Sequence, residues 1–109
     1  MSDISAFHAH LYYDADSLDK ATRIADKAGE LFDLVVGRKH EKAVGPHPMW
    51  SCQLAFKKIE FGNVVPWLSE NREGLTVFIH GCSGDDVKDH TDYAIWMGTI
   101  EPLKLDIFR

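Results

Sequence analysis

The sequence lacks the features that distinguish membrane-spanning and disulfide-bonded proteins. No apolar run approaches the roughly 20 residues that a helix needs to cross a bilayer. There are only two cysteines, Cys52 and Cys82, and they form no Cys-x-x-Cys pair. The first residues carry neither the basic region nor the apolar core of a signal peptide. We therefore expect reduced thiols and a cytoplasmic protein that is not bound to a membrane.

A block of positive charge is also lacking. The chain has 17 acidic and 12 basic residues, which gives a net charge of −5. The densest basic clusters, Lys57-Lys58 and Arg38-Lys39-His40, are short. Nucleic acid and anionic membrane surfaces are therefore not expected as partners, because both are bound through extended basic surfaces. There is no repeat, low-complexity segment or linker, and 109 residues predict a single domain over 1–109.

The hydrophobic pattern predicts an alternation of strands and helices. Strict alternation of apolar and polar residues indicates strands, and apolar residues at spacings of three and four indicate helices. Pro66 either lies in the first turn of the second helix or kinks it, and Gly37 is expected to stop the first. In chain order the predicted elements are strand 6–13, helix 17–35, strand 38–44, strand 49–56, helix 59–72, strand 75–80, helix 85–93 and edge strand 103–107.

This order predicts an α+β fold of the ferredoxin-like type. A βαββαβ chain forms an antiparallel sheet with two helices on one face. Strand parity divides the sheet into an apolar face under the helices and a mixed face opposite. The apolar face carries Phe7, Ala9, Leu11, Trp50, Cys52, Leu54, Phe56, Val77 and Ile79. The mixed face carries His8, His10, Tyr12, Ser51, Gln53, Thr76, Phe78 and His80.

The mixed face predicts a partner. Tyr12, Phe78 and Met49 would be exposed to water if nothing covered this face, and large apolar patches usually mark contact surfaces. We therefore expect a homodimer in which two sheets close face to face. Such a dimeric α/β barrel would enclose a cavity between the sheets.

Histidines are concentrated on the same face. His8 and His10 are two residues apart in the first strand, so their side chains point the same way. His80 ends a later strand on this face, and His47 lies in the rigid loop Gly45-Pro46-His47-Pro48. Neutral imidazole is the commonest metal ligand among side chains. His10, His47 and His80 are therefore candidate ligands for Zn²⁺ or Fe²⁺.

Each of these residues also has an ordinary structural interpretation, since a strand histidine is more often hydrogen-bonded or half-exposed than a ligand. His8 suits the role of an acid–base group, or of a residue that orients the ligands without binding the metal. His40 fits a surface position, and His90 fits an i,i+4 partner of Asp86. Cys82 is either a soft ligand or, as we favour, a buried thiol. No carboxylate stands out as a ligand by its position.

Several strings spread over the chain form a recognisable set. They are Phe7-His8-Ala9-His10-Leu11-Tyr12-Tyr13, Val36-Gly37-Arg38, Gly45-Pro46-His47-Pro48-Met49-Trp50, Val65-Pro66-Trp67-Leu68 with Asn71-Arg72, and His80 with Gly84-Asp85-Asp86 and Asp89-His90. Together they resemble the DOPA 4,5-dioxygenase family, from about residue 6 to Gly98. The resemblance implies a small ferredoxin-like domain that cleaves a catechol such as L-DOPA with O₂ by extradiol chemistry.

The resemblance also implies a non-haem iron(II) site. His10, His47 and His80 are the positions that it assigns as ligands, with His8 beside them. His8 or His90 would take a proton from the catechol. The chain departs from the expected pattern in two places. Gly81-Cys82 stands where a proline is expected, and Tyr93 where another histidine is expected.

Four further residues are candidate substrate contacts. Arg38 would pair with a substrate carboxylate through its guanidinium fork, and a solvated strand-edge charge is an equal alternative. Trp96 either walls a pocket or packs in the core. Tyr12 and Gln53 lie on the mixed face, where a bound catechol would meet them.

Two other functions fit the same pattern. The first is a non-catalytic dimeric ferredoxin-like module that binds a small aromatic ligand or a structural metal, because no carboxylate completes a two-histidine, one-carboxylate triad. The second is a zinc hydrolase, which would act without O₂. Zinc or another divalent ion could also replace iron in a crystal.

Overall fold

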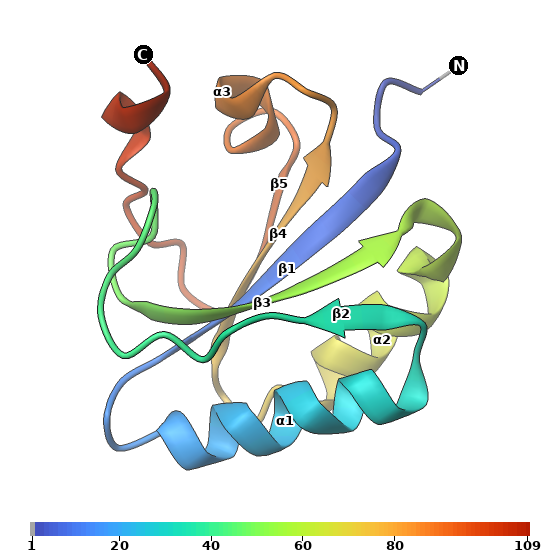
Figure 1. Cartoon of the computed structure of the whole chain (residues 1–109), viewed down its shortest axis with the longest axis vertical. Coiled ribbons are helices and arrows are strands. Elements are labelled where there is room, and N and C mark those ends of the chain that lie inside the picture. The colour runs from blue at the N-terminus through green and yellow to red at the C-terminus, as the bar shows by residue number, and fades with distance from the viewer. Residues whose placement is uncertain (1) are drawn as a thin grey trace.

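One antiparallel sheet forms the centre of the computed structural model, which describes residues 2–109. Its strands are β1 (Ala6–Tyr13), β2 (Leu34–Val36), β3 (Trp50–Lys57), β4 (Thr76–Cys82) and β5 (Ala94–Met97). Their order across the sheet is β2-β3-β1-β4-β5 (Figure 1). The first four strands follow the ferredoxin-like order, so the predicted α+β, βαββαβ fold is confirmed.

Strand β1 lies in the middle of the sheet and pairs antiparallel with both β3 and β4. On the β4 side His8 lies opposite His80, and on the β3 side His10 lies opposite Gln53. Residues opposite each other on neighbouring strands point to the same face. The pairing therefore brings side chains from distant parts of the sequence together around β1.

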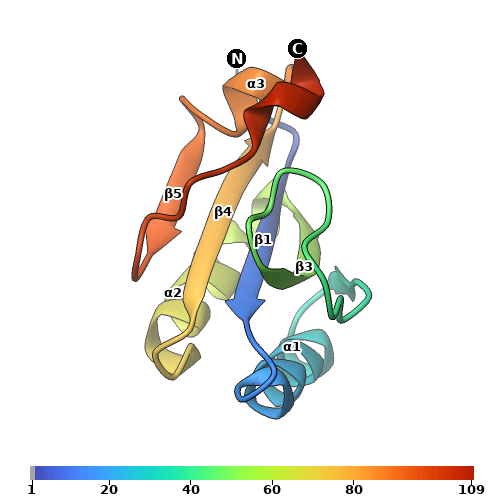
Figure 2. The same ribbon diagram turned by 90° about the vertical axis from the view of Figure 1, so that its left-hand side faces the viewer.

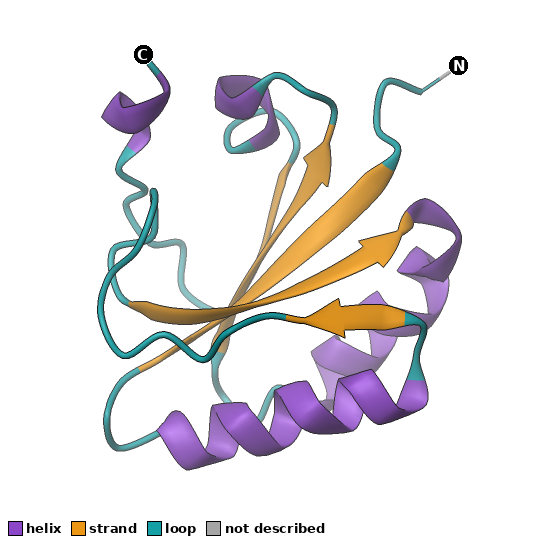
Figure 3. Ribbon diagram, viewed as in Figure 1, coloured by secondary structure: helices purple, strands orange, loops and turns teal. Residues whose placement is uncertain are grey.

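Two helices cover one face of the sheet, as expected. These are α1 (Leu18–Leu31) and α2 (Phe61–Asn71), and a 3₁₀ turn, Lys58–Glu60, leads into α2 (Figure 3). Burial of this apolar face stabilises the fold, because each fully buried aliphatic side chain contributes about 1.5–3 kcal/mol. The fully buried strand residues beneath the helices are Ala9, Leu11, Cys52, Leu54, Val77 and Ile79.

Helix α1 ends earlier than its apolar spacing predicts. Phe32 already has extended backbone, with φ −129° and ψ 157°, and β2 follows. Val35 continues the helical spacing only by coincidence, since it lies on β2 with 69% of its surface exposed. A Cβ at Gly29 would lie 2.8 Å from Val36 Cγ2, so this glycine lets the last turn of α1 approach β2. Helix α2 runs through Pro66, so the alternative that places this proline in the first turn is wrong.

The strand expected at 38–44 is also wrong. These residues belong to a loop from Gly37 to Met49, called loop 37–49 below. The Gly37 N–H donates to the Gln53 carbonyl at 2.7 Å, and a Cβ at position 37 would lie 3.1 Å from that oxygen. A second bond, from the His40 N–H to the Ser51 carbonyl at 3.1 Å, keeps the chain beside β3, but no regular ladder forms. Beyond it, Gly45 at φ +55° and two prolines are unsuited to a strand ladder.

The C-terminal part differs most from the prediction. The helix expected at 85–93 is the single turn α3 (Asp86–Asp89), capped by Asp85, whose carboxylate accepts the Lys88 N–H at 3.1 Å. The edge strand is β5, which pairs with β4, and not 103–107. Residues Leu105–Phe108 form a 3₁₀ turn instead. Among the described residues, no helix has the length and apolar character that crossing a bilayer requires.

The face opposite the helices is buried by the chain itself. Tyr12 is 1% exposed and Phe78 is 0% exposed. Loop 37–49 and the C-terminal segment 98–109 lie on this side of the sheet (Figure 2), and the Lys104 N–H joins them by donating to the Pro46 carbonyl at 2.8 Å. The reason for expecting a dimeric α/β barrel therefore does not hold, because Tyr12 and Phe78 need no second copy to cover them.

Candidate functional site

The histidines of the mixed face meet, as strand parity predicts. His10 Nε2 and His80 Nε2 are 3.2 Å apart, and both residues are buried. Two nitrogens bound at about 2.1 Å to one ion lie about 3.0–3.4 Å apart when the angle at the ion is between 90° and tetrahedral. The His10–His80 pair therefore already has the spacing of two ligands of one metal ion.

His80 is held in one orientation by its own strand. Its Nδ1 lies 3.0 Å from the Gly81 carbonyl. A carbonyl oxygen only accepts, so Nδ1 carries the proton and Nε2 keeps a lone pair. A backbone hydrogen bond of this kind typically orients metal-binding histidines.

His47 reaches the cluster from loop 37–49. Its ring centroid is 4.1 Å from that of His10, and its Nδ1 is 2.7 Å from the Tyr12 hydroxyl. When Nδ1–H donates to Tyr12, Nε2 is left as the ligand atom. Tyr12 therefore positions His47, and the rigid loop places the imidazole over the sheet as predicted.

His90 follows α3 and lies next to His80, with ring centroids 4.3 Å apart. Its Nδ1 is 2.6 Å from the Asp86 carbonyl oxygen, so the expected partner is Asp86, through its backbone and not its carboxylate. The ring of Phe108, in the C-terminal segment, packs 4.7 Å from His90. His90 therefore presents Nε2 as a hydrogen-bond acceptor.

A second group of donors shares His80. Ligand atoms of His8, His80 and Cys82 all lie within 4.8 Å of one another. His10 and His47 do not belong to a group of three that meets this spacing among the described residues. The structure thus brings His10, His47 and His80 side by side, and it also places His8 and Cys82 at ligand spacing from His80.

Burial keeps these imidazoles uncharged. It lowers the pKa of His47 and that of His80 to about 4, with neighbouring histidines adding to the effect. The pKa of His10 lies well below its ordinary value, first through burial and then through His47 and the other imidazoles. Burial also lowers the pKa of His8. Near pH 7 all four are neutral, so each can offer a lone pair to a cation that displaces the hydrogen bond between His10 Nε2 and His80 Nε2.

Asp89 is a buried carboxylate beside the histidines, with only 4% of its surface exposed. Its oxygens accept the Ser83 N–H at 3.1 Å and the Ser83 hydroxyl at 2.5 Å. Burial and the Asp89 charge raise the pKa of the Cys82 thiol. Asp89 therefore supplies fixed negative charge close to the cluster.

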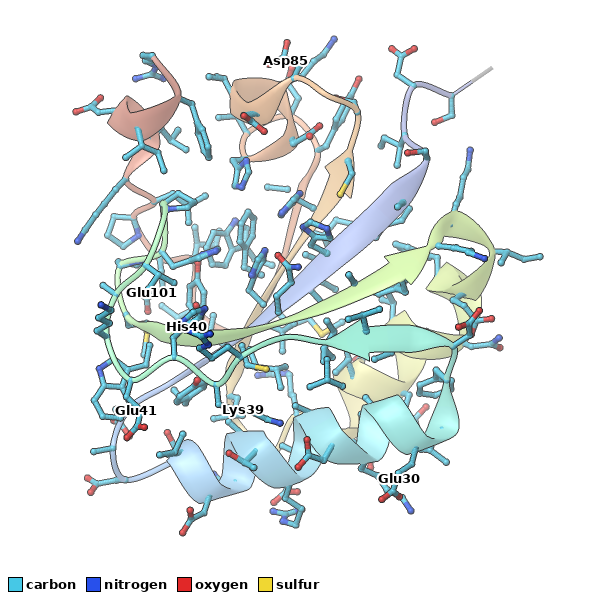
Figure 4. All side chains as sticks on the ribbon, in the orientation of Figure 1. Glu30, Lys39, His40, Glu41, Asp85 and Glu101 are labelled. Carbon is cyan, nitrogen blue, oxygen red and sulfur yellow. The ribbon has the colours of Figure 1, made fainter. Side chains whose placement is uncertain are left out.

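An open cavity of about 380 Å³ gives access to the cluster. A volume of this size accommodates a small aromatic molecule. Gln53 lines it as predicted (Figure 4 shows the side chains between loop 37–49 and α3). The residues that line it are His8, His10, Pro46, His47, Gln53, His80, Cys82, Gly84, Asp86, Asp89 and His90.

Three predicted substrate contacts lie outside this lining among the described residues. Arg38 is exposed on loop 37–49. Trp96 stacks on Phe78 at 4.5 Å and lies 6.0 Å from the Tyr12 ring, so both Trp96 and Tyr12 pack behind the histidines. His40 is half-buried and lines a smaller pocket beside His10 and His47, with its backbone N–H bound to the Ser51 carbonyl.

Sequence reasoning underrated one feature of this site and missed another. Cys82 was a possible ligand only as the alternative to a buried thiol, although it lies two residues after His80, the spacing that puts both on one face of a strand. No carboxylate stood out by its position, and no local pattern marks Asp89.

Comparison with known proteins agrees with the resemblance. The model of the Dopa 4,5-dioxygenase family matches residues 7–107. An uncharacterized 21.2 kDa protein of Botryotinia fuckeliana is 32% identical over 120 residues, which cover 95% of this chain and 63% of that protein. A DOPA 4,5-dioxygenase of Amanita muscaria is 26% identical over 113 residues, which cover 95% of this chain and 50% of that protein.

A solved structure has the same fold. It is a crystal structure of a candidate dioxygenase from Nostoc punctiforme, with a TM-score of 0.93 and 43% sequence identity. The match covers 95% of this chain and 90% of that chain. The chain spans less than two thirds of the length of the two curated relatives.

Proposed function

The chain belongs to the DOPA 4,5-dioxygenase family, and from this premise we propose that it is a non-haem iron(II) enzyme that cleaves a catechol such as L-DOPA with O₂. One observation carries the proposal: neutral, buried imidazoles with ligand spacing line a cavity open to solvent. In extradiol cleavage both oxygen atoms of O₂ enter the product, a muconate semialdehyde. The reaction therefore needs no other oxidant.

His10, His47 and His80 would hold the iron. When bound, iron(II) supplies the electron exchange that allows a catechol to react with O₂. The three imidazoles are uncharged, so they leave the ion its positive charge, which favours an anionic catecholate over a neutral phenol. The chain's own contribution is to hold these side chains in place through Tyr12 and the Gly81 carbonyl.

His8 and His90 are the proposed proton acceptors. Both line the cavity, and His8 is uncharged near pH 7 because burial lowers its pKa. His90 donates through Nδ1 to Asp86, which leaves Nε2 to accept a proton from a catechol hydroxyl. Asp89 would stabilise the imidazolium that forms on His8, since its charge already acts on that ring.

Gln53 is the proposed polar contact for the substrate, because its amide lines the cavity. Arg38 would meet only a substrate whose carboxylate extends beyond the cavity toward loop 37–49. A cytoplasmic protein that acts on small molecules and binds neither nucleic acid nor membranes remains our expectation. The homodimer stays a prediction without its original reason, and light scattering in solution would test it.

Oxygen consumption tests the function directly. Protein loaded with iron(II) under anaerobic conditions should consume O₂ when L-DOPA or a simpler catechol is added, with a yellow semialdehyde as product. His80→Ala should lower the rate by more than about 100-fold, because a metal ligand is lost. Lys27→Gln, at an exposed position of α1 on the opposite side of the sheet, should leave it unchanged. A panel of catechols that gives no O₂ uptake with iron-loaded protein would refute the proposal.

A second function is favoured by one specific observation. The donor group His8, His80 and Cys82 contains a thiol and no carboxylate, which suits a structural zinc ion. A non-catalytic module would bind zinc or an aromatic ligand without consuming O₂. The same oxygen assay therefore separates the two functions.

A further inference from the structure

Cys82 gives this chain a second way to hold a metal ion. We propose that His8, His80 and Cys82 form a separate position for a divalent ion that binds thiolate, such as Zn²⁺. An ion bound there would occupy His80, so that His80 could no longer bind a metal together with His10 and His47. Zinc binding there is independent of the proposed function, whereas competition with iron rests on it.

The geometry follows from the pairing of β1 with β4. His8 lies directly opposite His80, and Ala6 lies opposite Cys82. His80 and Cys82 are two residues apart on one strand, so they share the face on which His8 lies. The three ligand atoms are within 4.8 Å of one another. Tetrahedral zinc with nitrogen and sulfur ligands needs separations of about 3.3–3.8 Å, which side-chain rotation can supply.

The two positions differ in charge. A group of three neutral histidines leaves a divalent ion with its full positive charge in a buried place, which is costly until a substrate anion arrives. A Cys82 thiolate offsets one charge, and the fixed carboxylate of Asp89 lies in the same cavity to offset the second. The position with Cys82 therefore holds a soft ion without a substrate.

His80 cannot serve both positions at once. Its Nδ1 donates to the Gly81 carbonyl, so Nε2, which accepts a hydrogen bond from His10, is its one remaining ligand atom. That atom lies 3.2 Å from His10 Nε2. A zinc ion between His8 and Cys82 would therefore take the ligand that the proposed iron position needs, and zinc should inhibit the iron-loaded enzyme.

Cobalt is the probe for this position, because a thiolate bound to Co²⁺ gives a near-ultraviolet charge-transfer band that nitrogen ligands do not give. The metal-free protein titrated with Co²⁺ should show this band, and Zn²⁺ should abolish it. Cys82→Ser should lose the band and bind Zn²⁺ at least about 10-fold more weakly. Cys52→Ala should keep the band, since Cys52 is buried on the opposite face.

Two results would overturn the proposal. One is the absence of the band in the unaltered protein, and the other is its persistence in Cys82→Ser. Iron uptake by Cys82→Ser tests whether the position is separate, with circular dichroism as a check on folding. A loss of iron affinity as large as the loss of zinc affinity would place Cys82 at the iron position instead. A protein that shows the cobalt band but no O₂ uptake would refute the proposed function and leave the zinc position supported.

Discussion

The chain covers both faces of its sheet, but with different parts, and the histidine face opens to solvent through a cavity. The apolar face lies under α1 and α2, and residues such as Leu54 and Val77 are fully buried there. The opposite face lies under loop 37–49 and the C-terminal segment, and it buries His10 and His80 instead. Regular elements thus cover apolar side chains, and irregular ones cover the titratable side chains.

The two faces are held by different kinds of interaction. The apolar face stabilises the fold through the hydrophobic effect, which needs no directional contacts. The histidine face needs hydrogen bonds, and among the described residues no buried side-chain nitrogen or oxygen lacks a partner. Tyr12 with His47, and Gly81 with His80, supply two of these bonds. We infer that the first face carries stability and the second carries metal chemistry.

The largest expected effects come from one large-to-small substitution on each face. Leu54→Ala should lower the free energy of unfolding by about 2–5 kcal/mol, through lost burial and a cavity, with metal affinity retained in the folded fraction. His10→Ala should lower metal affinity by more than about 100-fold and change stability less. Urea denaturation and metal titration measure the two quantities. Equal losses of metal affinity in both variants would show that metal binding does not depend on the histidine face alone.

The two tyrosines of β1 allow the histidine face and the apolar face to be tested by the same chemical change. Tyr12 and Tyr13 are adjacent and point to opposite faces. Tyr12→Phe removes the hydroxyl bound to His47 and should weaken metal binding by about 10–100-fold. Tyr13→Phe is the matched control. It removes bonds to His40 and Ser51 and should cost about 1 kcal/mol in stability without affecting the metal. Calorimetric metal titrations of both variants would show whether only the Tyr12 hydroxyl matters.

A smaller effect is expected from pH. In the folded metal-free protein the pKa of His47 and of His80 is about 4, against an ordinary value of 6.5. Between these values the unfolded chain binds more protons, so stability is full above pH 6.5 and falls as pH drops toward 4. The melting temperature should fall by at least about 5 °C between pH 7 and pH 5.

His80→Gln provides the control for this pH dependence, because it removes one titrating group from the histidine face. Its melting temperature should fall less over the same interval. The carboxylates with lowered pKa, Asp14 and Glu73, titrate below this range and do not contribute to it. A pH profile that is flat from 7 to 5 would show that these imidazoles are not buried in the neutral form.

The apolar face could be predicted from the sequence almost completely. Alternation in β1, β3 and β4 identified Leu11, Leu54 and Val77 as core residues, because residues two apart in a strand share a face. The same rule put His10 and His80 together on the other face. The helix end at Leu31 was missed, since Val35 happens to continue the helical spacing on β2.

The covering of the histidine face could not be predicted in this way. Loop 37–49 and the C-terminal segment have no repeating pattern, so their contacts depend on tertiary packing alone. The bond between Lys104 and Pro46 and the packing of Phe108 on His90 leave no signal in the sequence. For the same reason, the expected exposure of Tyr12 suggested a second copy where the chain supplies its own cover.

Anomalous scattering from iron-loaded crystals would show whether the histidine face holds the metal. Crystals grown anaerobically with iron(II), measured at the iron absorption edge, should show one anomalous peak per chain on the histidine face. The peak should be bonded to His80 Nε2 and His10 Nε2, with His47 completing the ligand group. An iron-loaded crystal with no peak on this face, or with iron bound only elsewhere, would show that these histidines are not the iron ligands.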